Sequence, residues 1–161
     1  MLLHAALLAL LLTVAGQIDA WHDAVAPVAP QALARDLAAS MAQYRSAVMA
    51  YHSLHPGAGA ASVDLTTLRA DGLLASWSSA TGWSNYRGAD GTVFIYGDGA
   101  DRAAVIADLM HLSQRSALVG HADLVNARFV SELRGATAIA LPAPVLAALG
   151  QGGVLWLANA N

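Results

Sequence analysis

The sequence predicts an α+β fold in which a long helix packs on a mainly antiparallel β-sheet. Three observations support this class. A segment with helical spacing of apolar residues comes early, a turn motif between β-forming residues follows it, and short apolar runs separated by glycines occupy the last third. Helices and strands that do not alternate regularly are typical of α+β proteins. The 161 residues are enough for one such domain.

The composition predicts an ordered core and excludes several kinds of chemistry. Apolar residues make up 57 % of the chain and charged residues 12 %, about half the usual charged share. The chain has no lysine, which excludes Schiff-base chemistry and a P-loop lysine. It has no cysteine, which excludes disulfides, thiol nucleophiles and cysteine-bound zinc. The net charge of −3 argues against nucleic-acid binding.

Residues 1–20 form an apolar segment that we expect to be a signal anchor or a signal peptide. No charged side chain precedes Asp19, and the apolar run approaches the length of about 20 residues that spans a bilayer. Three alternatives are open: a retained anchor, a signal peptide cut near Gly16 or Ala20, and a buried core helix. The anchor residues would be Leu2, Leu3, Leu7, Leu8, Leu10, Leu11, Leu12 and Val14.

A linker and a long helix come next. Residues 21–30 are rich in proline and alanine and are predicted to be a linker, and residues 31–161 a single domain. Apolar residues recur every three or four positions from 31 to 55, which predicts a helix that Pro56 and Gly57 end. Tyr44 and Tyr51 lie on the apolar stripe and are expected in the core.

The middle of the chain predicts a short helix and a hairpin. Asp64 is placed to cap a helix that Gly72 ends. Residues 83–87 and 92–96 are β-forming and flank a turn that contains an Asp-Gly pair, which is a hairpin signal.

The last third predicts one more amphipathic helix and several strands. The helix spans residues 101–118, and Gly120 can close it. Strands follow at residues 128–133 and 137–141, a helical turn at 142–149, and a last strand at 154–157. The buried face of the helix is expected to comprise Val105, Ile106, Leu109 and Leu112.

One glycine-rich loop invites comparison with a dinucleotide-binding site. Gly97 and Gly99 follow a predicted strand and precede a helix, but Arg102 replaces the third glycine of that motif. Asp98 and Asp101 would also repel a pyrophosphate. The pattern favours a turn in which one aspartate caps the helix.

Signals for metal binding and hydrolysis are weak. His52 and His55 have a spacing that places two imidazoles on one side of a helix end, but no third ligand is evident, and both are expected to face solvent. The segment from Gly82 to Tyr86 lacks the last glycine of a nucleophile elbow. Glu132 is the only glutamate, so paired carboxylates are not expected. We predict no metal, no cofactor and no enzymatic activity.

Two tryptophans flank a loop rich in serine, threonine and glycine. Trp77 and Trp83 could form a platform for a sugar or a peptide. The favoured interpretation is that they close the edge of the core, because tryptophan is usually heavily buried.

Residues 30–160 show a pattern of apolar and turn positions that includes Tyr44, Tyr51, Pro56, Gly57, Trp77, Trp83, Pro142 and Gly153. This pattern resembles the PilM family of type IV (thin) pilus biogenesis proteins from conjugative plasmids. This is distinct from the actin-like ATPase of the same name, because the chain is short and has no P-loop lysine.

The resemblance implies a non-enzymatic component of pilus assembly that acts through protein–protein contacts. The outline, with an apolar N-terminus, a long helix and a sheet, is similar to pilins and pseudopilins. However, the basic leader and the early glutamate of a prepilin are missing, which favours an anchored accessory protein over a pilus subunit.

These considerations give an expected location and expected partners. The chain is expected at the inner membrane of a bacterium, held by residues 2–18, with its bulk in the periplasm. Its partners would be other pilus assembly proteins, bound through the long helix or the sheet edge. The alternative is an exported ligand-binding or hydrolytic domain that uses the Trp77–Trp83 loop.

Overall fold

The computed structural model of the chain describes residues 28–98, 101–149 and 153–160. The chain divides into two units, residues 1–33 and 34–161. The fold below is that of the second unit, and only the beginning of helix α2 is described in the first. The predicted anchor, from Leu2 to Val14, and the predicted cleavage positions near Gly16 and Ala20 lie outside the described residues.

The long predicted helix is α2, Val28–Leu54. It ends before Pro56 and Gly57, as predicted, but begins three residues earlier than the sequence indicated. Pro30 lies in its first turn, where a backbone N–H has no helical acceptor, so that the proline costs no hydrogen bond. None of the helices in the described part of the chain has both the length and the apolar character that crossing a bilayer requires.

The predicted short helix and hairpin are both present. Helix α3 spans Leu65–Ala70, and the short 3₁₀ helix η1 spans Ala80–Gly82. Strands β1, Ser84–Arg87, and β2, Thr92–Gly97, form the hairpin. Gly91 has a φ of +83°, a conformation that glycine adopts without strain.

The second amphipathic helix is shorter than predicted. Helix α4 spans Arg102–Leu112, and its predicted face is buried except for Leu112, which is 50 % exposed. The helix stops because Gln114 and Arg115 both have positive φ, and the Arg115 N–H bonds back to the Met110 carbonyl. The predicted helical residues 113–118 lie beyond the end of α4, and strand β3, Val119–Asp123, follows them. Gly120 therefore lies within a strand and does not close the helix.

The C-terminal part follows the predicted order. Strands β4, Arg128–Ser131, and β5, Gly135–Ala140, precede helix α5, Ala143–Ala148. The last strand is β6, Val154–Asn159. These strands differ from the predicted ones by a few residues at their ends.

The six described strands form one sheet in the order β1-β2-β6-β3-β4-β5. Every pairing is antiparallel. Strand β6 is last in the chain but lies in the middle of the sheet, where it joins the β1–β2 hairpin to the β3–β4–β5 meander. This confirms the predicted α+β class.

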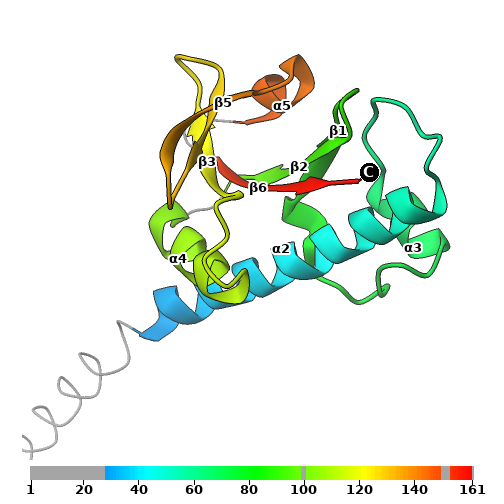
Figure 1. The fold of residues 1–161 in the computed structure, drawn as a ribbon. Coiled ribbons are helices and arrows are strands. Elements are labelled where there is room, and N and C mark those ends of the chain that lie inside the picture. Colours follow the sequence, from blue (N-terminus) through cyan, green and yellow to red (C-terminus); the bar gives the residue numbers. More distant parts are fainter. Residues whose placement is uncertain (1–27, 99–100, 150–152, 161) are drawn as a thin grey trace, which may run out of the picture. The chain divides into compact units, whose positions relative to one another are not determined.

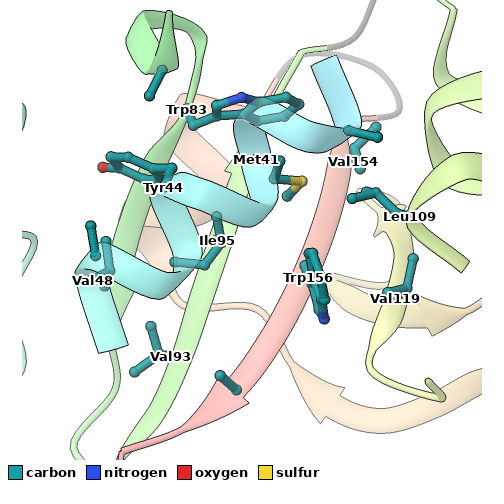
Figure 2. Packing of buried hydrophobic residues seen from close by; sticks show 14 of the residues in the cluster. Met41, Tyr44, Val48, Trp83, Val93, Ile95, Leu109, Val119, Val154 and Trp156 are labelled. Atoms are coloured by element: carbon teal, nitrogen blue, oxygen red, sulfur yellow. The ribbon is translucent and has the colours of Figure 1, made fainter. Parts of the chain in front are cut away.

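The sheet buries both of its faces. On one face, Met41, Tyr44 and Val48 of α2 pack against Ile95 and Trp156 of the central strands, and α4 lies on the same side (Figure 2). On the other face, α5 covers a second cluster that includes aromatic residues of β2 and β4 (Figure 1). Successive side chains of β2 alternate between the two clusters because strand residues point alternately to opposite faces.

Candidate functional site

The two histidines near the end of α2 lie in different environments. His52 is 1 % exposed and neither of its ring nitrogens has a hydrogen-bond partner, so the expectation that it faces solvent was wrong. His55 is exposed and stacks on Tyr51 with ring centroids 4.3 Å apart. Burial, and then the nearby Arg87 and His55, lower the pKa of His52. In the described part of the chain, no three metal-ligating side chains are placed to share an ion.

The glycine-rich loop after β2 has a structural explanation. The Asp101 side chain accepts a hydrogen bond from the Ala104 N–H at 3.3 Å and caps α4. Gly97 is the last residue of β2, and a Cβ there would approach the Gly82 carbonyl oxygen at 2.5 Å. Gly99 lies outside the described residues. The antiparallel sheet also differs from the parallel sheet of dinucleotide-binding domains.

The structure does not bring Trp77 and Trp83 together in one platform. Trp83 is 6 % exposed, lies in the core and donates from its Nε1 to the Ser40 hydroxyl at 3.2 Å. Trp77 is 81 % exposed, so the prediction that it closes the core was wrong. The serine-rich sequence around Trp77 contains no local pattern that distinguishes an exposed tryptophan from a buried one.

The other residues of the family pattern have structural positions. Tyr44 is buried and Tyr51 is half-buried against the core. Pro56 and Gly57 are exposed after α2, and Pro142 precedes α5. Gly153 lies against Leu149, whose side chain a Cβ at Gly153 would overlap.

One edge of the sheet, β1, is covered by residues 61–63. The Arg87 N–H donates to the Ala61 carbonyl at 2.9 Å. The buried Asn85 side chain accepts from the Val63 N–H at 2.9 Å and donates to the Val63 carbonyl at 2.8 Å. The same amide nitrogen lies 2.6 Å from the Tyr44 hydroxyl. On this edge, the Asn85 side chain thus makes the hydrogen bonds to Val63 that the backbone of a neighbouring strand would otherwise make.

The opposite edge, β5, has a different character. Its sequence from Gly135 to Ala140 has no charged residue and no proline, and four of its six residues are exposed. The pairing with β4 shifts register between Arg128 and Val130. There the Thr137 hydroxyl donates to the Phe129 carbonyl at 2.6 Å and accepts from the Ile139 N–H at 3.2 Å. Such an irregularity bends an edge strand.

A groove of about 580 Å³ lies beside β5. Its other wall is the β1–β2 hairpin, although β6, β3 and β4 separate these strands within the sheet. Figure 1 shows β5 and β1 on either side of α5. The curvature of the sheet therefore brings its two ends towards one groove. The lining residues are Ala60, Tyr86, Gly88, Ala89, Asp90, Thr92, Phe94, Ala138, Ile139, Ala140, Leu141 and Pro142.

The groove has both polar and apolar surface and carries one charged side chain. Asp90 accepts hydrogen bonds from the Thr92 N–H at 3.0 Å and the Thr92 hydroxyl at 2.8 Å. These bonds lower the pKa of Asp90, which keeps it ionised. The other lining residues offer aromatic and aliphatic surface, small side chains and backbone groups. The small and apolar residues of this lining suit recognition of an uncharged group.

Sequence reasoning placed a strand near β5 but did not identify the groove. The composition of residues 135–140, uncharged and without proline, could have indicated an unprotected edge. Nothing local shows that β5 is the last strand of the sheet, because strand order depends on distant pairings.

The protein is thus a small α+β protein in which the uncharged strand β5 lies at the end of the described sheet, beside a groove. The PilM family model matches residues 8–157, and the chain belongs to the PilM family. This confirms the resemblance found in the sequence, and membership implies a role in type IV pilus biogenesis.

A solved structure shares this fold. It is the crystal structure of a candidate PilM protein from Escherichia coli B7A, which is 22 % identical to this chain with a TM-score of 0.55. The match covers 79 % of this chain and 92 % of the other chain. At this identity the likeness concerns the fold alone. A comparison with curated proteins finds no significant match.

Proposed function

We propose that the chain is a non-enzymatic, membrane-associated component of type IV pilus biogenesis that acts through protein–protein contacts. The observation that carries this proposal is the uncharged edge strand β5 beside a groove. Edge strands offer backbone donors and acceptors that a partner protein can pair with. Family membership supplies the process in which that contact takes place.

The alternative, a ligand-binding or hydrolytic domain at the Trp77–Trp83 loop, receives less support. It needs both tryptophans at one surface, whereas Trp83 lies in the core. The described groove has an aspartate but no histidine or serine among its lining residues.

The role in assembly is tested by genetic complementation. Cells that carry the pilus system are deleted for this chain, and pili are counted by electron microscopy after the chain is supplied again. We expect the deletion to abolish pili and the wild-type chain to restore them. Normal piliation in the deletion strain would contradict the proposal.

The proposed location has its own experiment. The chain, tagged at its C-terminus, is expected in the inner-membrane fraction, with its bulk in the periplasm and residues 2–18 as the anchor. N-terminal sequencing of the purified product distinguishes a retained anchor from a cleaved signal peptide. A product found only in the cytoplasmic fraction would contradict export.

A further inference from the structure

We infer that His52 acts as a proton-operated latch beside strand β1. Uptake of a proton by this imidazole releases residues 56–61, here called the cover segment, from Arg87 of β1. The backbone of β1 at Arg87 is then free to pair with another chain, as exposed strand edges do. The latch is a conformational device of the fold and stands independently of the proposed role in pilus biogenesis.

The first argument is the environment of the His52 ring. The residue is 1 % exposed, and neither ring nitrogen has a hydrogen-bond partner among the described residues. Most buried polar side-chain atoms in proteins are hydrogen-bonded, and a neutral imidazole offers one donor and one acceptor. The neutral ring is therefore buried at a cost, and a charged ring would be buried at a larger one.

The second argument is the sign of the surrounding charges. Burial is the largest cause that lowers the pKa of His52, and Arg87 of β1 and then His55, beyond the end of α2, lower it further. Tyr51 also lies beside the ring, edge-on with centroids 5.6 Å apart, and stacks on His55. None of these described groups is a carboxylate that could stabilise an imidazolium. A proton on His52 therefore adds a positive charge near a guanidinium.

The third argument is that the same guanidinium holds the cover segment. The Arg87 Nη1 donates to the Ala58 carbonyl at 2.7 Å and to the Pro56 carbonyl at 3.5 Å. The backbone N–H of Arg87 donates to the Ala61 carbonyl at 2.9 Å. The side chain thus makes two of these three hydrogen bonds, and displacing the guanidinium removes both.

The fourth argument is that the cover segment is attached by little else. Its side chains are exposed except that of Ala58, which is half-buried. Gly57 and Gly59 have open space where a Cβ would lie. Segments with few buried contacts open locally at a lower free energy than global unfolding. The opening ends at Val63, because the Asn85 side chain binds both backbone groups of that residue.

Opening of the cover segment is linked to pH through the pKa of His52. In the closed chain this pKa is lowered, whereas a hydrated ring in the open chain approaches the ordinary value of 6.5. The open chain then binds the proton more readily. The closed state is therefore fully stable above about pH 6.5 and loses stability as pH falls below it. For one proton, the open fraction rises by at most about 25-fold between pH 7 and pH 5.

The test is hydrogen exchange of the full-length chain in detergent, measured by NMR at pH 7 and pH 5 and corrected for intrinsic exchange. The Arg87 amide reports the opening, because it bonds to Ala61 of the cover segment. The Leu157 amide of β6, which bonds to the Leu118 carbonyl, reports global unfolding. We expect the protection of the Arg87 amide to fall about tenfold from pH 7 to pH 5. This protection should be insensitive to low urea, unlike that of Leu157.

Three substitutions assign the effect to the latch. His52→Leu keeps a buried apolar side chain and removes the titrating group, so the protection of the Arg87 amide should no longer depend on pH. His55→Gln is the matched control at an exposed position and should keep most of the dependence. Arg87→Gln removes the charge that holds the cover segment and should leave the amide at this position weakly protected at both pH values. Each variant is compared with itself at two pH values, so that a change in its overall stability does not confuse the result.

Three results would overturn the inference. The first is equal protection of the Arg87 amide at the two pH values in the wild-type chain. The second is a fall in His52→Leu as large as that in the wild type. The third is an Arg87 amide whose protection depends on urea as strongly as that of Leu157, which would mean that the cover segment opens only when the whole chain unfolds.

Discussion

The two edge strands of the described sheet, β1 and β5, differ in how their unpaired backbone edges are treated. β1 is covered by residues 61–63, which Asn85 holds with hydrogen bonds to the backbone of Val63. β5 is uncharged, has an irregular pairing with β4 and lies beside a groove. Among the described residues, the sheet thus covers one edge with its own chain and leaves the other uncharged and irregularly paired. The difference indicates that the residues near each edge strand, and not the fold as a whole, determine whether that edge is covered.

The largest effect is expected from a change that separates the β5 end from the rest of the sheet. A Cβ at Gly120 of β3 would overlap the Val130 carbonyl oxygen of β4. Gly120→Ala should therefore lower the free energy of unfolding by about 3 kcal/mol or more, because backbone must move. The measurement is urea denaturation, with hydrogen exchange to show that β4 amides lose protection before those of β1.

Gly57→Ala is the matched control for this change. Gly57 has open space around its Cα, and the same substitution there should alter stability by less than about 0.5 kcal/mol. Equal effects at the two glycines would show that the close approach of β3 and β4 at Gly120 is absent in solution.

The next effect concerns the covered edge. Asn85→Ala leaves the buried N–H and carbonyl of Val63 without their partner and should destabilise the chain by about 3 kcal/mol. Ser84→Ala, at an exposed neighbour on the same strand, should have little effect. Hydrogen exchange of the Val63 amide measures the loss directly. An unchanged exchange rate in Asn85→Ala would mean that Asn85 does not hold the cover.

A smaller effect is expected from pH. Burial lowers the pKa of His52 below its ordinary value of 6.5, and Arg87 and His55 lower it further. The unfolded chain then binds the proton more readily than the folded chain, so stability should fall as pH decreases below about 6.5. Urea midpoints at pH 7 and pH 5 measure this fall, which His52→Leu should reduce.

The exposed His55 provides the control for the pH experiment. His55→Gln should keep most of the fall in stability, because the burial of His52 is unchanged. Asp90 and Asp123 also have lowered pKa values. Their contribution to stability is lost only near and below pH 3.8, outside the interval from pH 7 to pH 5. A fall of the same size in His52→Leu would assign the effect to another group.

The smallest effect on stability is expected at the open edge itself. Ala138→Glu lies at an exposed position and should change the free energy of unfolding by less than about 0.5 kcal/mol. The same variant should nevertheless fail to restore pili in the deletion strain. A large loss of stability would mean that Ala138 supports the fold, and the edge comparison would then need a variant at Ala140.

Much of the fold could be predicted because its signals are local. The apolar spacing of α2, the Asp-Gly turn of the hairpin and the glycines near Val154 each act within a few residues. Strand β3 was missed because Val119 is its one strongly β-forming residue, and it follows a helical pattern without a break. Two left-handed residues, Gln114 and Arg115, end that helix, and neither is a usual helix terminator.

The candidate site could be predicted only in part. An unprotected strand near residues 137–141 was within reach of composition, and contact through a sheet edge was expected. The groove was not, because it arises where β5 and the hairpin approach each other from opposite ends of the sheet. The burial of His52 and the exposure of Trp77 likewise depend on segments distant in sequence.

The central position of β6 affects the order in which the sheet can form during synthesis. Until Val154–Asn159 is synthesised, no strand pairing joins the β1–β2 hairpin to the β3–β4–β5 meander. Until then, β2 and β3 each have only one of their two neighbouring strands. Folding of the sheet therefore waits for the final strand and is expected to be slow relative to a helical protein of similar size. A translation product that stops before Val154 would expose the unpaired edges of β2 and β3. We expect such a product to aggregate and to be degraded by proteases.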